Sequence, residues 1–170
     1  MGLVTVIGTA PGRDAWVDQC VRGLAGHDVI VLDIETGYEL GKIGTVFELT
    51  GLDRFLFLQD SAEILSETFW GRLSEHPGSV GLMPEPGGFG CYMGVYERKH
   101  LAVMDWPATL TKEDSIREEA AWCRRYANVS GASVLFPELV DREGTVREHL
   151  GRTNLVLENE HFRKWKGTWA

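Results

Sequence analysis

Cysteine is scarce in this sequence, and long apolar runs are missing from it. The three cysteines, Cys20, Cys91 and Cys123, are odd in number, far apart and without CxxC spacing, which argues against a disulfide framework or a zinc knuckle. No apolar run approaches the ~20 residues that a membrane span needs, and the N-terminus lacks the pattern of a signal peptide. We therefore expect a cytoplasmic protein without a membrane span.

Basic residues are also few in this sequence, and the best-known catalytic motifs are absent from it. Lys and Arg number 17 against 25 acidic residues, a net charge of −8, which disfavours a broad nucleic-acid-binding face. The chain has no Walker A loop, G-x-G-x-x-G, HExxH or G-x-S-x-G motif. These absences disfavour P-loop chemistry, a standard dinucleotide site, a zinc hydrolase and a serine hydrolase.

What the sequence does contain is an alternation of strand and helix patterns rich in glycine, with 20 glycines in 170 residues. A chain of this length predicts one domain over residues 1–170. Strands are predicted at 3–8, 28–34, 55–58, 79–83, 133–139 and 154–159, helices at 14–24, 39–49, 61–73 and 111–127, and a strand leading into a short helix at 88–101. The sequence therefore predicts an α/β fold in which helices flank a central, mainly parallel sheet.

Two polar segments follow predicted strands and are candidates for a binding site. The segment "FLFLQDS" carries an apolar strand that stops at Gln59, Asp60 and Ser61, and its two apolar faces are typical of a central parallel strand. The loop "GTAPGRD" follows the first strand, where open α/β sheets bind ligands. Asp60 is well placed to bind Mg²⁺ or Mn²⁺ on a diphosphate, although capping a turn is the alternative role.

Three further segments each have a functional and a purely structural interpretation. Glu113 and Asp114 begin a helix, where acids either do chemistry or stabilise the helix dipole. The glycines of "MPEPGGFG" allow a ligand to come close or simply make a turn. The tail "HFRKWKGTWA" has basic residues that suit a diphosphate, or it is a solvated segment with aromatic anchors.

Taken in order, these segments resemble a GT-A-fold glycosyltransferase related to family 2 enzymes, in a compact form. The matching segments are "VTVIGTAPGRD", "ELGKIGTVFELTGLDRFLFLQDSAEI", "GGFGCYMGVYERKHL" and "TKEDSIREE". They are similar to the nucleotide-binding strand and loop, the strand that leads to the acidic DxD tip, the acceptor-side strand and the catalytic acid pair. The resemblance covers most of residues 3 to 127.

The resemblance implies an enzyme that moves a sugar from a nucleotide-sugar donor, most commonly a UDP-sugar, to an acceptor hydroxyl with inversion. It makes Asp114 the catalytic base, oriented by Glu113, and makes Asp60 and His161 ligands of a divalent cation, Mn²⁺ or Mg²⁺. It assigns donor binding to residues at the strand ends and in the tail: Thr9, Ala10, Arg13, Asp33, Lys42, Gln59, Asp60, Ser61, Lys164 and Lys166. Glu85, Gly87, Gly88 and Phe89 are the expected acceptor-side residues.

The strand tip departs from the family pattern, because "QDS" stands where DxD is expected and Gln59 carries no charge. Two other functions remain open from the residues. One is a sugar nucleotidyltransferase, and the other is a protein that binds a nucleotide sugar without catalysis. The acceptor alternatives are a glycan, a lipid-linked sugar, a small metabolite, a protein and a hydroxylated DNA base. Six tryptophans leave room for an aromatic contact between copies of the chain.

Overall fold

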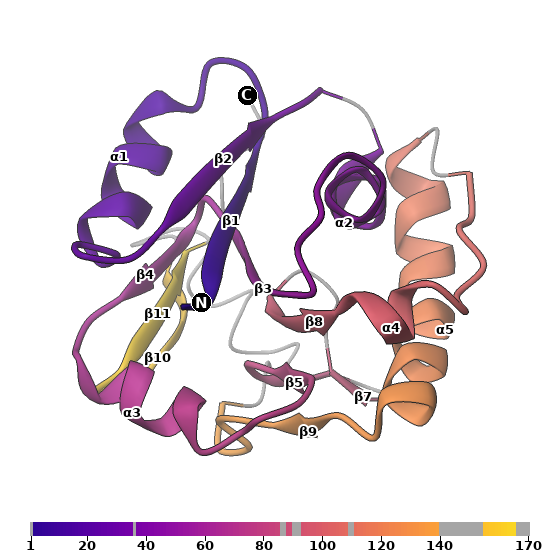
Figure 1. Ribbon diagram of the computed structural model, residues 1–170. Coiled ribbons are helices and arrows are strands. Elements are labelled where there is room, and N and C mark those ends of the chain that lie inside the picture. The colour runs from indigo at the N-terminus through magenta and orange to yellow at the C-terminus, as the bar shows by residue number, and fades with distance from the viewer. Residues whose placement is uncertain are drawn as a thin grey trace.

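Figure 1 shows the computed structural model, an α/β domain in which helices lie on both sides of a central sheet. The structure describes residues 2–35, 37–85, 88–89, 93–108, 111–139 and 155–165. Within these residues the sheet has six strands in the order β2-β1-β3-β8-β5-β9. Its strands are β1 (Val4–Thr9), β2 (Val29–Asp33), β3 (Arg54–Gln59), β5 (Val80–Gly81), β8 (Gly94–Glu97) and β9 (Ser133–Val134).

The sheet is mixed but mostly parallel. Strand β1 pairs in parallel with β2 and β3, and β5 pairs in parallel with β9. Strand β8 is antiparallel to both of its neighbours, β3 and β5, so it is the one reversed strand of this sheet as the described residues form it. The predicted α/β class and the central position of residues 55–58 are therefore confirmed.

Alternating residues of the central strands divide the core into two layers, as the period of two in a strand requires. Val6, Phe55 and Phe57 face a layer formed with α2 (Tyr38–Leu49), α4 (Arg98–Leu101) and α5 (Lys112–Ser130). Ile7 and Leu56 face the other layer, formed with α1 (Asp14–Arg22) and α3 (Thr68–Ser74). Phe55, Leu56 and Phe57 are at most 1% exposed, which explains the apolar run on both faces of β3.

A second, three-stranded sheet packs beside the first. It has the order β10-β11-β4, with β4 at Ala62–Ile64, β10 at Leu155–Glu158 and β11 at Phe162–Trp165. The helix predicted over 61–73 is therefore wrong in its first part: Ala62 and Ile64 are buried alternately with the half-buried Glu63, and β4 pairs with β11. The segments β6 (Pro84–Glu85) and β7 (Gly88–Phe89) form a short hairpin.

The helix ends agree with the sequence in part. Thr111 caps α5, because its hydroxyl accepts a hydrogen bond from the backbone N–H of Asp114. Helix α1 begins at Asp14 as predicted, and it ends at Arg22, before the predicted end at residue 24. None of the described helices is both long and apolar enough to cross a membrane.

Candidate functional site

The carboxyl ends of β1 and β3 form the point where the chain changes direction across the sheet. From β1 the chain continues to β2 on one side and then crosses back to β3 on the other side. In open α/β sheets a ligand binds in the crevice that such a reversal leaves at the carboxyl edge. Thr9 and Gln59 end the two strands, and the backbone N–H of Asp60 donates to Gly8 O at 3.1 Å.

Asp60 is held at this edge by three hydrogen bonds to its carboxylate. Arg13 Nε donates to Oδ2 at 2.5 Å and Arg13 Nη2 donates to Oδ1 at 2.7 Å, so the guanidinium binds the carboxylate with two parallel bonds. Thr9 Oγ1 donates to Oδ2 at 2.7 Å. Asp60 is 5% exposed and Thr9 is 4% exposed, so this pairing is largely shielded from water.

The loop after β1 is shaped to present Arg13 to Asp60. Gly12 has a φ of 81°, a left-handed conformation that favours glycine, and it reverses the chain directly before Arg13. The guanidinium then packs over the ring of Trp16, 5.3 Å from the centroid. Its hydrogen bonds to Asp60 raise the pKa of Arg13, so the group is a permanent cation.

Lys164 reaches the same place from β11. Its ammonium donates a hydrogen bond to Ser61 Oγ, and its side chain is buried. Burial lowers the pKa of Lys164 to about 8, while the nearby carboxylates of Glu39 and Asp60 favour its charged form and Arg13 opposes it. The structure therefore brings the predicted donor-binding residues Arg13, Asp60, Ser61 and Lys164 together.

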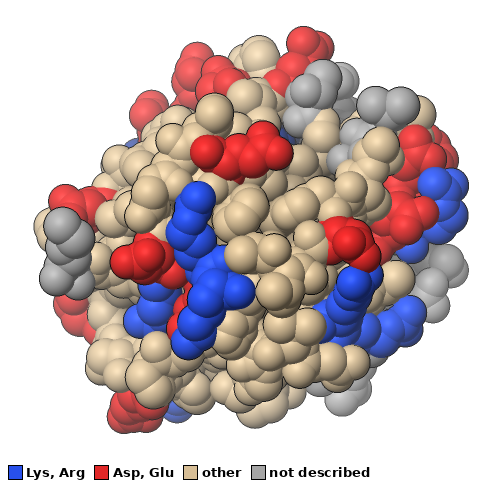
Figure 2. Space-filling model, turned by 45° about the vertical axis from the view of Figure 1, so that its right-hand side comes forward, with Lys and Arg blue, Asp and Glu red and all other residues tan. Residues whose placement is uncertain are grey.

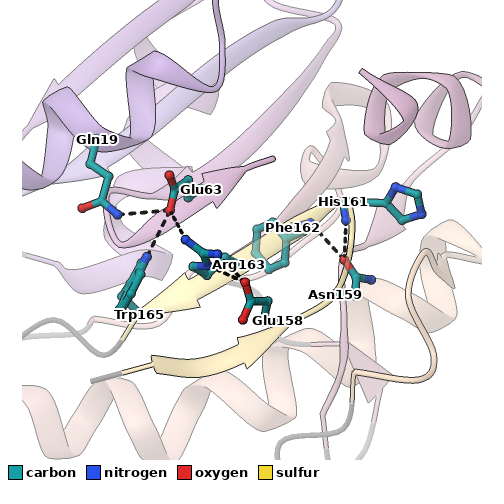
Figure 3. A network of polar contacts seen from close by, with 8 residues as sticks. All are labelled: Gln19, Glu63, Glu158, Asn159, His161, Phe162, Arg163 and Trp165. Carbon is teal, nitrogen blue, oxygen red and sulfur yellow. Dashed lines mark hydrogen bonds and ion pairs between the residues drawn. The ribbon is translucent and has the colours of Figure 1, made fainter. Parts of the chain in front are cut away.

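The residues on either side of Lys164 fix the position of its strand (Figure 3). Arg163 lies opposite Glu63 across the β11–β4 pairing. Glu63 Oε2 accepts hydrogen bonds from Gln19 Nε2 at 3.1 Å, Trp165 Nε1 at 3.3 Å and Arg163 Nη1 at 3.4 Å. Since successive residues of a strand face opposite sides, anchoring Arg163 and Trp165 on one side directs Lys164 to the other.

Lys42, on helix α2, is 9% exposed, and its side chain lies beside Gly8 near the carboxyl end of β1. A methyl group on Gly8 would lie 3.0 Å from Lys42 Cδ and 2.6 Å from Phe57 Cζ, so only glycine fits between these two side chains.

We expect Gly8→Ala to lower the free energy of unfolding by about 1–3 kcal/mol, because it overpacks a filled interior. Urea denaturation measures this change. Gly51→Ala is the control, since nothing lies within 4 Å of a methyl group there. Equal stability of the two variants would show that Lys42 and Phe57 can move aside.

Glu39 and Cys20 belong to the site although the sequence analysis did not single them out. Glu39 Oε1 accepts a hydrogen bond from Gln59 Nε2, which orients the uncharged residue of the strand tip. Glu39 lies in the first turn of α2, and a helix that follows β2 must begin near the carboxyl edge, a signal that could have identified it. Cys20 Sγ lies 3.9 Å from Gln59 O, and burial raises the pKa of Cys20 to about 12, so it remains a thiol.

The predicted pairing of Asp60 with His161 on a divalent cation is not formed. Strand β11 is antiparallel to β4, so His161 lies beside Leu65, whose N–H donates to His161 O, and Figure 3 shows its ring turned away from Glu63. His161 Nδ1 is 2.6 Å from Thr68 Oγ1, and the ring stacks on Phe136. Within the described residues, no three His, Cys, Asp or Glu side chains are grouped as a metal site. Together with the guanidinium on Asp60, this donor set does not fit a divalent cation.

Asp114, one of the two acids at the start of α5, serves to cap that helix. Asp114 accepts hydrogen bonds from the Thr111 N–H at 3.2 Å and from Arg117 Nη2 at 2.9 Å. These bonds, that of Thr111 first, lower the pKa of Asp114, and Glu113 is exposed. The structural interpretation is therefore observed for Asp114, and the catalytic role of Asp114 and Glu113 stays a prediction.

The remaining predicted residues lie at other places or outside the described ranges. Ala10 follows β1, and Asp33 is exposed at the end of β2, opposite Thr9 in the strand register. The backbone of Glu85 pairs with that of Gly88 in the β6–β7 hairpin, where Phe89 also lies, and β7 packs against α5. Gly87 and Lys166 fall outside the described residues.

The surface in Figure 2 agrees with the acidic balance of the chain. On this face, the described Lys and Arg side chains form small separate groups next to Asp and Glu. A polyanion such as nucleic acid needs a continuous basic surface, which the described residues of this face do not provide.

Comparison with known proteins does not place the chain in a family. No protein-family model matches the sequence, and no curated protein is significantly similar to it. The case for a function therefore depends on the geometry of the site.

Proposed function

We propose that this protein is a glycosyltransferase of the GT-A type that moves a sugar from a nucleotide-sugar donor, a UDP-sugar, to an acceptor hydroxyl. The observation that carries the proposal is the buried Asp60 at the chain reversal of the sheet, with the Arg13 guanidinium bound to its carboxylate and the Lys164 ammonium bound to the neighbouring Ser61. A nucleoside diphosphate is a polyanion that binds where cations and backbone groups meet at the carboxyl ends of parallel strands.

In the proposed reaction the acceptor oxygen forms a bond to the anomeric carbon as the bond to the diphosphate oxygen breaks. The acceptor hydroxyl gives its proton to Asp114, and the electron pair of the broken bond leaves with the nucleoside diphosphate. Arg13 and Lys164 stabilise the charge that develops on the leaving group. Thr9, Ala10 and Asp33 lie at the same edge and contact the nucleoside part of the donor.

The position of α5 supports the role of Asp114. In Figure 1, α5 begins at the upper end of the view, toward which β1 runs, so the first turn with Asp114 lies at the same end of the molecule as the carboxyl end of β1. The hairpin with Glu85, Gly88 and Phe89 packs against the same helix nearer its lower end in Figure 1, and its acceptor-side role stays a prediction. Since Arg117 and Thr111 bind the Asp114 carboxylate, acceptor binding has to release at least one of these bonds before Asp114 takes a proton.

Asp114→Asn should lower sugar transfer by about 10²–10⁴-fold, the usual contribution of a general base, and leave donor affinity unchanged. Released UDP from a panel of UDP-sugars and acceptors measures transfer, and calorimetry measures donor binding. Thr111→Ala is the control, because it removes the helix cap and keeps the carboxylate. If Thr111→Ala reduces transfer as much as Asp114→Asn, or if Asp114→Asn retains transfer, Asp114 is not the base.

The product also separates the alternatives. A sugar nucleotidyltransferase releases pyrophosphate, whereas the proposed enzyme releases a nucleoside diphosphate. The engaged Asp114 carboxylate favours a second candidate, a protein that binds a nucleotide sugar without catalysis. Tight donor binding without transfer to any acceptor, and without hydrolysis, would support that candidate.

A further inference from the structure

The carboxylate of Asp60, which the sequence predicts to bind a metal ion, is already paired with the guanidinium of Arg13. Both oxygens of Asp60 accept hydrogen bonds from the guanidinium of Arg13, whose planar fork matches a carboxylate better than any other side chain. A divalent cation bound to the same oxygens would stand next to this permanent positive charge and be repelled by it. Gln59 cannot compensate, because its amide carries no charge and is bound to Glu39.

The two cations of the site have donors left for a ligand. The Nη1 group of Arg13 makes no hydrogen bond to any described residue, and the Arg13 side chain is 21% exposed. Lys164 has three N–H donors, and within the described part of the chain its only hydrogen-bond acceptor is Ser61 Oγ. A buried ammonium with one neutral acceptor is costly, and an anion beside it would remove that cost.

We propose that Arg13 and Lys164 bind the diphosphate of the donor in place of a divalent cation, and that Asp60 is a positioning residue that orients Arg13. This inference rests on the proposed function and fixes its cofactor requirement: the protein binds its donor without a metal. Thr9 completes the arrangement, because its hydroxyl donates to the same oxygen of Asp60 as Arg13 Nε does.

The first test measures the binding of UDP, GDP and ADP to the full chain by calorimetry, once in EDTA and once in Mn²⁺. The nucleotide that binds should do so with affinities that agree within about threefold in the two conditions, a difference of less than 1 kcal/mol. Binding that requires Mn²⁺ would overturn this inference and leave the proposed function standing. If none of the three nucleotides binds in either condition, the proposed function fails, and the inference fails with it.

The second test frees the carboxylate. Arg13→Ala should weaken nucleotide binding in EDTA by roughly 10–100-fold, and Mn²⁺ should restore part of the loss because Asp60 can then accept a metal ion. Arg22→Ala removes an exposed arginine from the last turn of α1, the helix that Arg13 precedes, and is the control. Unchanged affinity in Arg13→Ala would contradict the proposal.

Arg13→Lys keeps the charge but not the fork, and it guards against a folding defect in the alanine variant. It should weaken binding in EDTA and gain no Mn²⁺ dependence, since a cation still sits on Asp60. A Mn²⁺ requirement in Arg13→Lys equal to that in Arg13→Ala would show that charge at this position does not exclude a metal, and would overturn the proposal.

Discussion

Lys164→Met should lower nucleoside-diphosphate affinity by about 10–100-fold, because it removes a charged hydrogen-bond donor from the proposed diphosphate site. The same change should raise the free energy of unfolding by about 1–3 kcal/mol. Lys164 is buried, and an apolar side chain of similar length avoids the desolvation of its ammonium. A variant that loses binding while it gains stability separates a functional lysine from a structural one.

The pH dependence of this stability gain follows from the pKa of Lys164. Burial lowers this pKa from 10.5 to about 8, so between these values the unfolded chain holds a proton that the folded chain has lost. Stability of the wild type therefore rises with pH across this window, by up to about 3 kcal/mol from this group, and the advantage of Lys164→Met shrinks by the same amount.

Urea denaturation of both proteins at pH 7 and pH 10 measures this difference, since groups other than Lys164 cancel. Lys99→Met is the control, because Lys99 is an exposed lysine that pairs with Glu97. A loss of stability in Lys164→Met, or a constant difference between the two pH values, would mean that the ammonium is well compensated in the folded state.

Asp60→Asn should lower the free energy of unfolding by about 2–4 kcal/mol, because it leaves the guanidinium of Arg13 without its carboxylate at a largely buried position. The amide that replaces the carboxylate presents one acceptor oxygen where the carboxylate accepted bonds from Arg13 and Thr9 on two. Nucleotide binding should fall with it, since Arg13 loses its orientation. Thermal or urea unfolding and calorimetry measure the two effects.

A double-mutant cycle measures how much of this loss of stability comes from the ion pair between Arg13 and Asp60. The combination of Asp60→Asn with Arg13→Gln should be less damaging than the sum of the single changes, because the second removes the charge that the first left unpaired. Asp53→Asn is the control at the other end of β3, where the side chain is exposed. Additive effects would show that Arg13 and Asp60 do not stabilise each other.

The central architecture was predictable because its signals are local. The apolar runs of β1 and β3 and the polar residues at their ends identify two buried parallel strands and their shared carboxyl edge. From that edge alone, Thr9, Arg13 and Asp60 could be placed together. The capping box of α5 was equally readable, since Thr111 and Asp114 lie within one turn.

The second sheet was not predictable because its partners are distant in the sequence. The segment at Ala62–Ile64 is too short to show a period, and it becomes a strand because Phe162–Lys164 pairs with it. The place of His161 depends on the same pairing, because the pairing of Phe162 with Ile64 sets His161 beside Leu65 and away from Asp60. The hydrogen bond of Glu39 to Gln59 likewise depends on how α2 packs, which no pattern within α2 reveals.

The position of Lys164 late in the sequence has a consequence for the order in which the site forms during folding. Ser61 and Lys164 are 103 residues apart, whereas Thr9, Arg13 and Asp60 are all available once β3 has been made. Closing so long a loop is slow, so the first sheet can assemble before β11 adds its lysine. A diphosphate bound between Arg13 and Lys164 would in turn hold β11 against β4, since a ligand stabilises the folded state that binds it. Ligand binding by this protein would then report that the chain has finished folding.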